Sequence, residues 1–335
     1  MTRRERVQLA IQHQETDFIP YQINLTKQAL SRLLDYTGDP DYVESIGNHF
    51  IAAGYGGYLK ETKPGSEYWR DHFGVVWNRN GADKDIGMIE GSVLPEPTLD
   101  EYEFPDIEEP RLRKDFEQVL ANSSDEFVIG AVNFSTFERA WTLRGIENFL
   151  ADMVAEPEFV EELLDTICEH NLKVLDVMLS YPIDGIYLGD DWGQQKGLIM
   201  GPNHWRRFIK PRIARMYEKA KSSGRAVIQH SCGDINELFP DLIEIGMDVY
   251  QTFQPEIYDI RSVKREYGKD LTFWGGISTQ QVLPWVGPDE VQRVACEIME
   301  IMGPGGGYIA APTHSVPADV PPENIVALAE VFKNQ

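Results

Sequence analysis

Cysteine is scarce in this sequence. Only three of the 335 residues are cysteines, namely Cys168, Cys232 and Cys296. An odd and sparse set argues against a framework of disulfides and is typical of a protein in a reducing compartment. Residues 2–11 are charged and lack the apolar core that a signal peptide needs. We therefore expect a cytoplasmic protein without disulfides.

Basic residues and long apolar runs are also few. The chain has 31 lysines and arginines against 54 aspartates and glutamates, which gives a formal net charge of -23 at pH 7. This balance opposes binding to nucleic acid or to an anionic membrane. No stretch approaches the roughly 18 consecutive apolar residues of a membrane helix. The expected partners are therefore neither nucleic acid nor membrane.

The chain alternates short apolar runs with stretches of helical periodicity. Six runs are rich in Val, Ile, Tyr or Phe, as strands prefer, at residues 127–133, 185–191, 226–232, 249–254, 271–277 and 308–313. Strands separated by helices imply right-handed parallel crossovers. Two further strands are expected near 18–24 and within 49–58. The total of eight is the number in a closed TIM barrel.

The expected fold is thus α/β, with one (β/α)₈ TIM-barrel domain over residues 1–335. It would carry an N-terminal helix and an insertion near residues 61–125, where the alternation breaks and a small hairpin and a long surface connection are expected. An open doubly wound sheet is the alternative. That alternative is weakened because no glycine-rich dinucleotide fingerprint follows any strand.

The residues that carry chemistry begin with His230 and Cys232, at the end of the run 226–232. Side chains on a strand alternate with period two, so this imidazole and this thiol share one face. Carboxyl ends of strands are where α/β folds place their chemistry. A histidine and a cysteine so placed make half of a zinc site. His314 follows the last predicted strand and is expected at the same opening as a third ligand.

Further polar residues follow other predicted strands. The most prominent are Asp190 and Asp191, whose side chains point to opposite sides, so only one of them is expected to face the opening. That carboxylate is interpreted as a metal ligand, a general base or an anchor for a substrate amine. The other candidates, for substrate binding, are Asn133, Gln251, Gln254 and Gly276.

The chain also resembles a known family along nearly its whole length. The motifs that carry the resemblance are Arg-x-Arg-Val at 4–7, Asp17-Phe18-Ile19-Pro20, Phe137-Glu138-Arg139-Ala140-Trp141, Asp190-Asp191-Trp192-Gly193, His230-Ser231-Cys232-Gly233, Gly275-Gly276-Ile277, Ala311-Pro312-Thr313-His314 and Pro321-Pro322-Glu323-Asn324. They are similar to those of the uroporphyrinogen decarboxylase superfamily, in particular its cobalamin-dependent methyltransferases. The resemblance implies a TIM barrel and a zinc ion bound by a His-x-Cys pair and a later cysteine. His230 and Cys232 match the pair, whereas His314 stands where the later cysteine would be.

On this resemblance the expected activity is zinc-dependent methyl transfer, with Asp190 and Asp191 as catalytic residues. The methyl group would move between a methylcobamide on a separate corrinoid protein and a small molecule, either a thiol or a tetrahydrofolate-type acceptor. The decarboxylases carry an arginine-rich segment near the N-terminus, but residues 21–27 contain no arginine. Two alternatives stay open, a metal-independent lyase or decarboxylase acting on another small acid, and a non-catalytic protein that binds a corrinoid or small molecule.

Overall fold

A curled parallel sheet forms the centre of the molecule. The computed structural model describes residues 1–55, 58–80 and 87–335. The sheet has seven strands, β1 (Phe50–Tyr55), β6 (Phe127–Val132), β7 (Gly185–Gly189), β10 (Ala226–His230), β11 (Val249–Phe253), β12 (Thr272–Ile277) and β13 (Tyr308–Pro312). All six pairings are parallel. The six strands predicted from apolar runs and the one within 49–58 are therefore confirmed, although residues 56–57 of that range lie outside the described residues.

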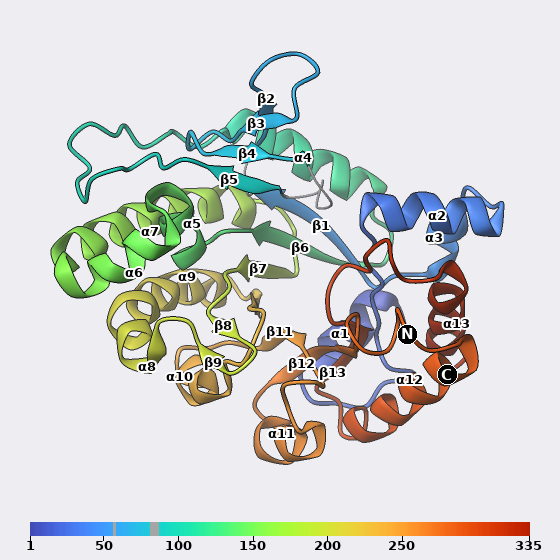
Figure 1. Cartoon of the computed structure of the whole chain (residues 1–335). Helices are drawn as coiled ribbons and strands as arrows, with labels where there is room; N and C mark the ends of the chain where they lie inside the picture. The colour runs from blue at the N-terminus through green and yellow to red at the C-terminus, as the bar shows by residue number, and fades with distance from the viewer. Residues whose placement is uncertain (56–57, 81–86) are drawn as a thin grey trace.

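The order of the strands decides between the two expected architectures. Each strand of the sheet lies next to the strand that follows it along the chain, in the order β1-β6-β7-β10-β11-β12-β13. A doubly wound sheet reverses its order at a switch point, and this sheet has no reversal. The sheet instead curls continuously, with helices outside it (Figure 1). The architecture is a singly wound, TIM-barrel-like α/β fold.

Helices cover the outer face of the curled sheet. They are α2 (Lys27–Thr37), α3 (Tyr42–Ile46), α4 (Glu109–Asn122), α5 (Phe137–Arg144), α6 (Ile146–Ala155), α7 (Pro157–Leu179), α8 (Gly201–His204), the π-helical turn η1 (Trp205–Ile209), α9 (Lys210–Ser222), the 3-10 turn η2 (Asn236–Leu238), α10 (Phe239–Glu244), α11 (Ile260–Tyr267), α12 (Pro288–Met302) and α13 (Pro322–Lys333). Proline stands in the first turn of several of them, where its missing N–H costs no hydrogen bond. None of the helices in the described ranges is long and apolar enough to cross a membrane.

The expected eighth strand, near 18–24, is not a regular strand in the described residues. Tyr21 and Leu25 form isolated parallel bridges to Ala310 and Val316. On the other side, the backbone N–H of His49 donates to the carbonyl of Tyr21 at 3.1 Å. The segment therefore hydrogen-bonds to β13 and to the residue before β1, which are the two edges of the sheet. The segment makes isolated hydrogen bonds to these edges and no continuous ladder. The reason is that Pro20 has no N–H and the N–H of Ile23 donates to the side chain of Asn48.

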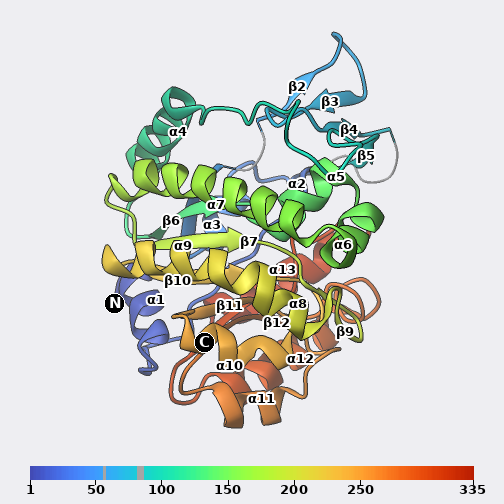
Figure 2. The ribbon, with the colours of Figure 1, turned by 90° about the vertical axis from the view of Figure 1, so that its left-hand side faces the viewer.

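The insertion differs in extent and content from its prediction. It contains a four-stranded antiparallel sheet, formed by β2 (Lys60–Glu61), β3 (Tyr68–Arg70), β4 (Val76–Asn78) and β5 (Met88–Glu90), with residues 81–86 outside the described part. The predicted range ran to residue 125, but α4 is the crossover helix between β1 and β6. The insertion therefore ends before α4. Figure 2 shows the small sheet toward the same end of the molecule as the arrowheads of β6 and β7.

The opposite end of the sheet is filled by apolar side chains. Phe50, Phe127 and Trp274 pack inside the curl, and the rings of Phe50 and Trp274 stack with their centroids 4.2 Å apart. Val7, on helix α1 (Arg3–Ile11), belongs to the same cluster and is fully buried. Because α1 and this cluster close the amino end of the strands, the polar groups gather at the carboxyl end, as in other barrels.

Candidate metal centre

Three side chains that sequence analysis assigned to a metal come together in the structure. His230 is the last residue of β10, Cys232 follows it by two residues, and His314 lies two residues after β13. One ligand atom from each can be chosen so that all lie within 4.8 Å of one another. The Sγ atom of Cys232 is 3.6 Å from Nε2 of His230. The alternation along β10 and the curl of the sheet thus produce one cluster at the mouth.

The chemistry of this cluster fits zinc. Two imidazoles and a thiol are the donors that zinc prefers, and three protein ligands leave a position for a substrate. In a tetrahedral site with bonds of about 2.0–2.3 Å, ligand atoms lie roughly 3.3–3.8 Å apart. The separation of Cys232 and His230 falls in this range. His314 is exposed, and one of its ring nitrogens lies within 4.8 Å of the ligand atoms of the pair.

His230 is held in place through its other ring nitrogen. Its Nδ1 atom lies in a short hydrogen bond with Oε1 of Gln251, on β11. The same oxygen accepts the hydroxyl of Tyr187, on β7, at 3.1 Å. This arrangement directs Nε2 of His230 toward Cys232, as outer partners of metal-binding histidines do. Gln251, predicted to bind substrate, therefore lies where it positions a ligand.

Asp191 is the aspartate that faces the cluster. Its Oδ1 atom lies 3.3 Å from Nε2 of His230 and accepts the backbone N–H of Cys232 at 2.8 Å. Burial acts to raise the pKa of Asp191, but the hydrogen bond and charge of His230 outweigh it and lower that pKa to about 2. For His230, burial acts to lower the pKa, whereas Tyr187 and Asp191 hold it well above its usual value. The two side chains thus stabilise each other's charged forms.

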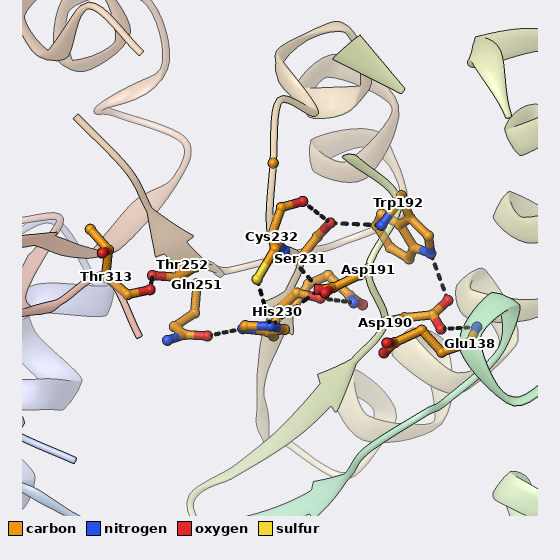
Figure 3. Close-up of polar contacts among 12 residues, drawn as sticks. Glu138, Asp190, Asp191, Trp192, His230, Ser231, Cys232, Gln251, Thr252 and Thr313 are labelled. Atoms are coloured by element: carbon orange, nitrogen blue, oxygen red, sulfur yellow. Dashed lines mark hydrogen bonds and ion pairs between the residues drawn. The ribbon is translucent and has the colours of Figure 1, made fainter. Parts of the chain in front are cut away.

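Asp190 points the other way, toward the start of helix α5. It is fully buried and accepts the backbone N–H groups of Thr136, Phe137 and Glu138 and the indole N–H of Trp192. The hydroxyl of Thr136 adds a short fifth hydrogen bond. Burial raises the pKa of Asp190, and these donors oppose the rise. Figure 3 shows Asp190 and Asp191 on opposite sides of the chain, so we do not retain Asp190 as a group that contacts substrate.

Glu138 is a site residue that sequence analysis missed. It lies in the first turn of α5, and its carboxylate lines the same cavity as Asp191, His230 and His314. Burial, together with the charges of Asp191 and Asp190, raises its pKa to about 8. Two sequence signals pointed to it, its place after the strand that ends at Val132 and its membership in the motif of residues 137–141. The approach of α5 to the mouth depends on the buried contact with Asp190.

The cluster lies between two cavities. One has a volume of about 400 Å³ and is lined by Glu138, Asp191, His230 and His314, with side chains from the insertion, Asp71, Trp77 and Arg79. The other, of about 300 Å³, is lined mainly by uncharged groups, namely Gly193, Gln194, Gln195, Cys232, Gly233, Gln254, Thr279, Gln280, Thr313 and His314. Two molecules can therefore approach the cluster from different sides.

The other three residues predicted to bind substrate, Asn133, Gln254 and Gly276, lie in three different places. Asn133 is exposed in the larger cavity. Gln254 lines the smaller cavity and accepts the backbone N–H of Gly233 at 3.2 Å. Gly276 lines neither of these two cavities. A Cβ atom there would lie 2.7 Å from the hydroxyl of Tyr308 and 3.1 Å from Ile298 on α12, so this position faces the packed helix layer.

Comparison with known proteins agrees with this fold. The profile described as uroporphyrinogen decarboxylase (URO-D) matches residues 78–335, which is most of the chain. The chain belongs to the uroporphyrinogen decarboxylase family. A methyltransferase from Methanosarcina mazei has a structure that superposes on this one with a TM-score of 0.73, covers 99% of this chain and 98% of that chain, and is 19% identical. This likeness shows a shared fold.

Characterised relatives of the family are distant and of two kinds. The uroporphyrinogen decarboxylase of Magnetococcus marinus is 21% identical over 183 residues, which are 53% of this chain and 49% of that protein. The methylated-thiol–coenzyme M methyltransferase of Methanosarcina mazei is 22% identical over 155 residues, 46% of this chain and 40% of that protein. The matched stretch thus spans about half or less of each relative.

Proposed function

We propose that this protein is a cytoplasmic zinc-dependent methyltransferase that moves a methyl group between a corrinoid and a small thiol. The observation that carries the proposal is the cluster of His230, Cys232 and His314, whose ligand atoms lie within 4.8 Å of one another. Acid–base catalysis has no need of the thiol of Cys232. One relative is named as a methyltransferase of methylated thiols, which supports the same chemistry. We also propose that segment 20–25 takes the position of the eighth strand in the barrel that carries this site.

The residues of the chain would have distinct roles in this reaction. His230, Cys232 and His314 would hold zinc, which when bound supplies a Lewis acid that lowers the pKa of a substrate thiol. Gln251 fixes the ring of His230 through Nδ1, and Asp191, which lies 3.3 Å from the Nε2 atom that would bind zinc, holds the backbone N–H of Cys232. The two cavities beside the cluster would separate the small molecule from the corrinoid, which we propose is carried by a partner protein.

The first test is the metal content of protein purified without added metal or chelator. We expect about one zinc per chain in wild type and loss of zinc in Cys232→Ala. Cys168→Ala serves as the matched control, because Cys168 is buried in α7, away from the cluster. A folded wild type that takes up no metal, even when zinc is offered, would overturn the proposal and favour a metal-independent lyase.

The second test is catalysis with defined substrates. Free methylcobalamin replaces the corrinoid protein, and loss of its methyl–cobalt absorbance is followed after addition of 2-mercaptoethanol, cysteamine or tetrahydrofolate. The proposal predicts demethylation by a thiol in wild type and at least a 100-fold loss in Cys232→Ala, about 2.7 kcal/mol in transition-state stabilisation. Tight binding of methylcobalamin without turnover would instead favour a non-catalytic binding protein.

A further inference from the structure

The cavity of about 400 Å³ contains three carboxylates with different surroundings. Asp71 is buried and forms an ion pair of 2.8 Å with Arg139. Asp191 lies 3.3 Å from the imidazole of His230. Glu138 lines the cavity and forms no ion pair with any residue that the structure describes. One carboxyl group in this cavity therefore has no ion-pair partner among the described residues.

The surroundings of Glu138 favour a positive group. Asp190 and Asp191 lie close enough to repel its charge. A carboxylate that is partly removed from water is stabilised strongly by an opposite charge within hydrogen-bond distance. The rings of Trp77 and Phe134 line the same cavity with their centroids 5.5 Å apart, and aromatic faces also attract cations.

Neither the basic residue of this cavity nor the metal site would neutralise Glu138. Arg79 lines the cavity, but its guanidinium lies over the ring of Trp69 on the small sheet, 5.3 Å from the ring centroid. The two charges of a zinc ion would be balanced by two thiolates, those of Cys232 and of a bound substrate. Because burial and the neighbouring aspartates raise the pKa of Glu138, a cationic part of the substrate would be the group that holds it ionised.

We propose that Glu138 binds the ammonium group of an aminothiol whose sulfur lies at the His230–Cys232–His314 cluster. The inference rests on the proposed methyl transfer and names the class of thiol that the site accepts. Glu138 acts as a specificity-determining residue and takes no part in breaking or forming the methyl bond. Its distance from the cluster is limited by the cavity, whose volume suits a small molecule.

Binding of three matched probes tests this assignment without catalysis. The probes are 2-(methylthio)ethylamine, 2-(methylthio)ethanol and 2-(methylthio)ethanesulfonate, measured by calorimetry against wild type, Glu138→Gln and the control Glu162→Gln. Glu162 is an exposed carboxylate on α7 that does not line the cavity, so its variant makes the same substitution outside the site. We expect wild type and the control to bind the amine about 10- to 100-fold more tightly than the alcohol. Glu138→Gln should bind both within about twofold, at the wild-type affinity for the alcohol.

Equal binding of the three probes to wild type, or preference for the sulfonate, would overturn the inference, and this comparison needs no variant. An amine preference that persists in Glu138→Gln would also overturn it. The outcome for catalysis is separate. If methylcobalamin is demethylated by 2-mercaptoethanol and cysteamine equally well and the probes bind equally, the methyltransferase stands and the role of Glu138 falls. If the amine binds selectively but no thiol is methylated, the proposed function falls and the amine site stands.

Discussion

Replacing Asp190 by asparagine is expected to destabilise the protein strongly. Its carboxylate is fully buried and is the acceptor in all five of its hydrogen bonds. Oδ1 accepts the backbone N–H groups of Thr136 and Glu138 at 3.2 and 2.8 Å. Oδ2 accepts the backbone N–H of Phe137 at 3.0 Å, the indole N–H of Trp192 at 2.6 Å and the hydroxyl of Thr136. An asparagine amide would direct an NH₂ group at one of these two sets.

The magnitude follows from the number of donors that lose their acceptor. Whichever way the amide is turned, at least two N–H donors face another donor. Each buried donor left without a partner costs about 1–3 kcal/mol. Asp190→Asn should therefore lower the free energy of unfolding by about 2–6 kcal/mol, measured by urea denaturation followed by circular dichroism.

The adjacent aspartate provides the control. The side chain of Asp191 is 35% exposed, and an asparagine there can still accept the backbone N–H of Cys232. Asp191→Asn should change the free energy of unfolding by less than about 1 kcal/mol, while weakening zinc binding or methyl transfer. If Asp190→Asn unfolds like wild type but has lost activity, Asp190 is a catalytic group and its role is not structural.

Three other perturbations follow from the structure. Gln251→Leu removes the partner of Nδ1 of His230 and should weaken zinc affinity about 10- to 100-fold in competition with a chelator; unchanged affinity would exclude the positioning role. Burial lowers the pKa values of His49 and His170 to about 4, so the unfolded chain takes up protons first as the pH falls. The free energy of unfolding should then decrease as the pH falls from about 6.5 to 4, by up to about 1.4 kcal/mol per pH unit for each histidine. A free energy of unfolding that stays constant over this range, measured by urea denaturation at each pH, would contradict this. Gly233 has a φ of +79° and lies against the hairpin formed by β8 (Gly193–Gln194) and β9 (Gly197–Leu198). Gly233→Ala would place a Cβ atom 2.2 Å from the backbone of this hairpin, so the melting temperature should fall clearly. An unchanged melting temperature would refute the predicted clash.

The part of the site that the sequence predicts depends on local geometry. The period of two along β10 predicts that His230 and Cys232 share a face, and their ligand atoms are 3.6 Å apart. The same period predicts that only one of Asp190 and Asp191 faces the mouth. It cannot tell which, because that depends on where helix α5 begins relative to β7. The buried donors of α5 decide the question, and they come from about fifty residues earlier in the chain.

Other features escaped prediction because side chains replace regular backbone contacts. The segment near Tyr21 has strand-like composition, but the side chains of Asn48 and Gln22 take part in hydrogen bonds that a strand ladder would otherwise make. Glu138 stands in one of the motifs that carry the family resemblance, but a glutamate in the first turn of a helix is ordinary and does not by itself indicate a site. Its role depends on the cavity, which includes Trp77 from an insertion whose fold the sequence did not predict.

The charge of the cavity also bears on the two activities known among relatives. A porphyrinogen is large and highly anionic, and cationic side chains are needed to receive its carboxylates. The cavity beside the cluster has a volume of about 400 Å³, and Glu138 and Asp191 line it beside the ion-paired Asp71. Residues 21–27 contain no arginine that would reverse this balance. The proposed aminothiol fits the volume of this cavity, the donor set of the cluster and the carboxyl group of Glu138, whereas an anionic porphyrinogen would meet the acidic groups of Glu138 and Asp191.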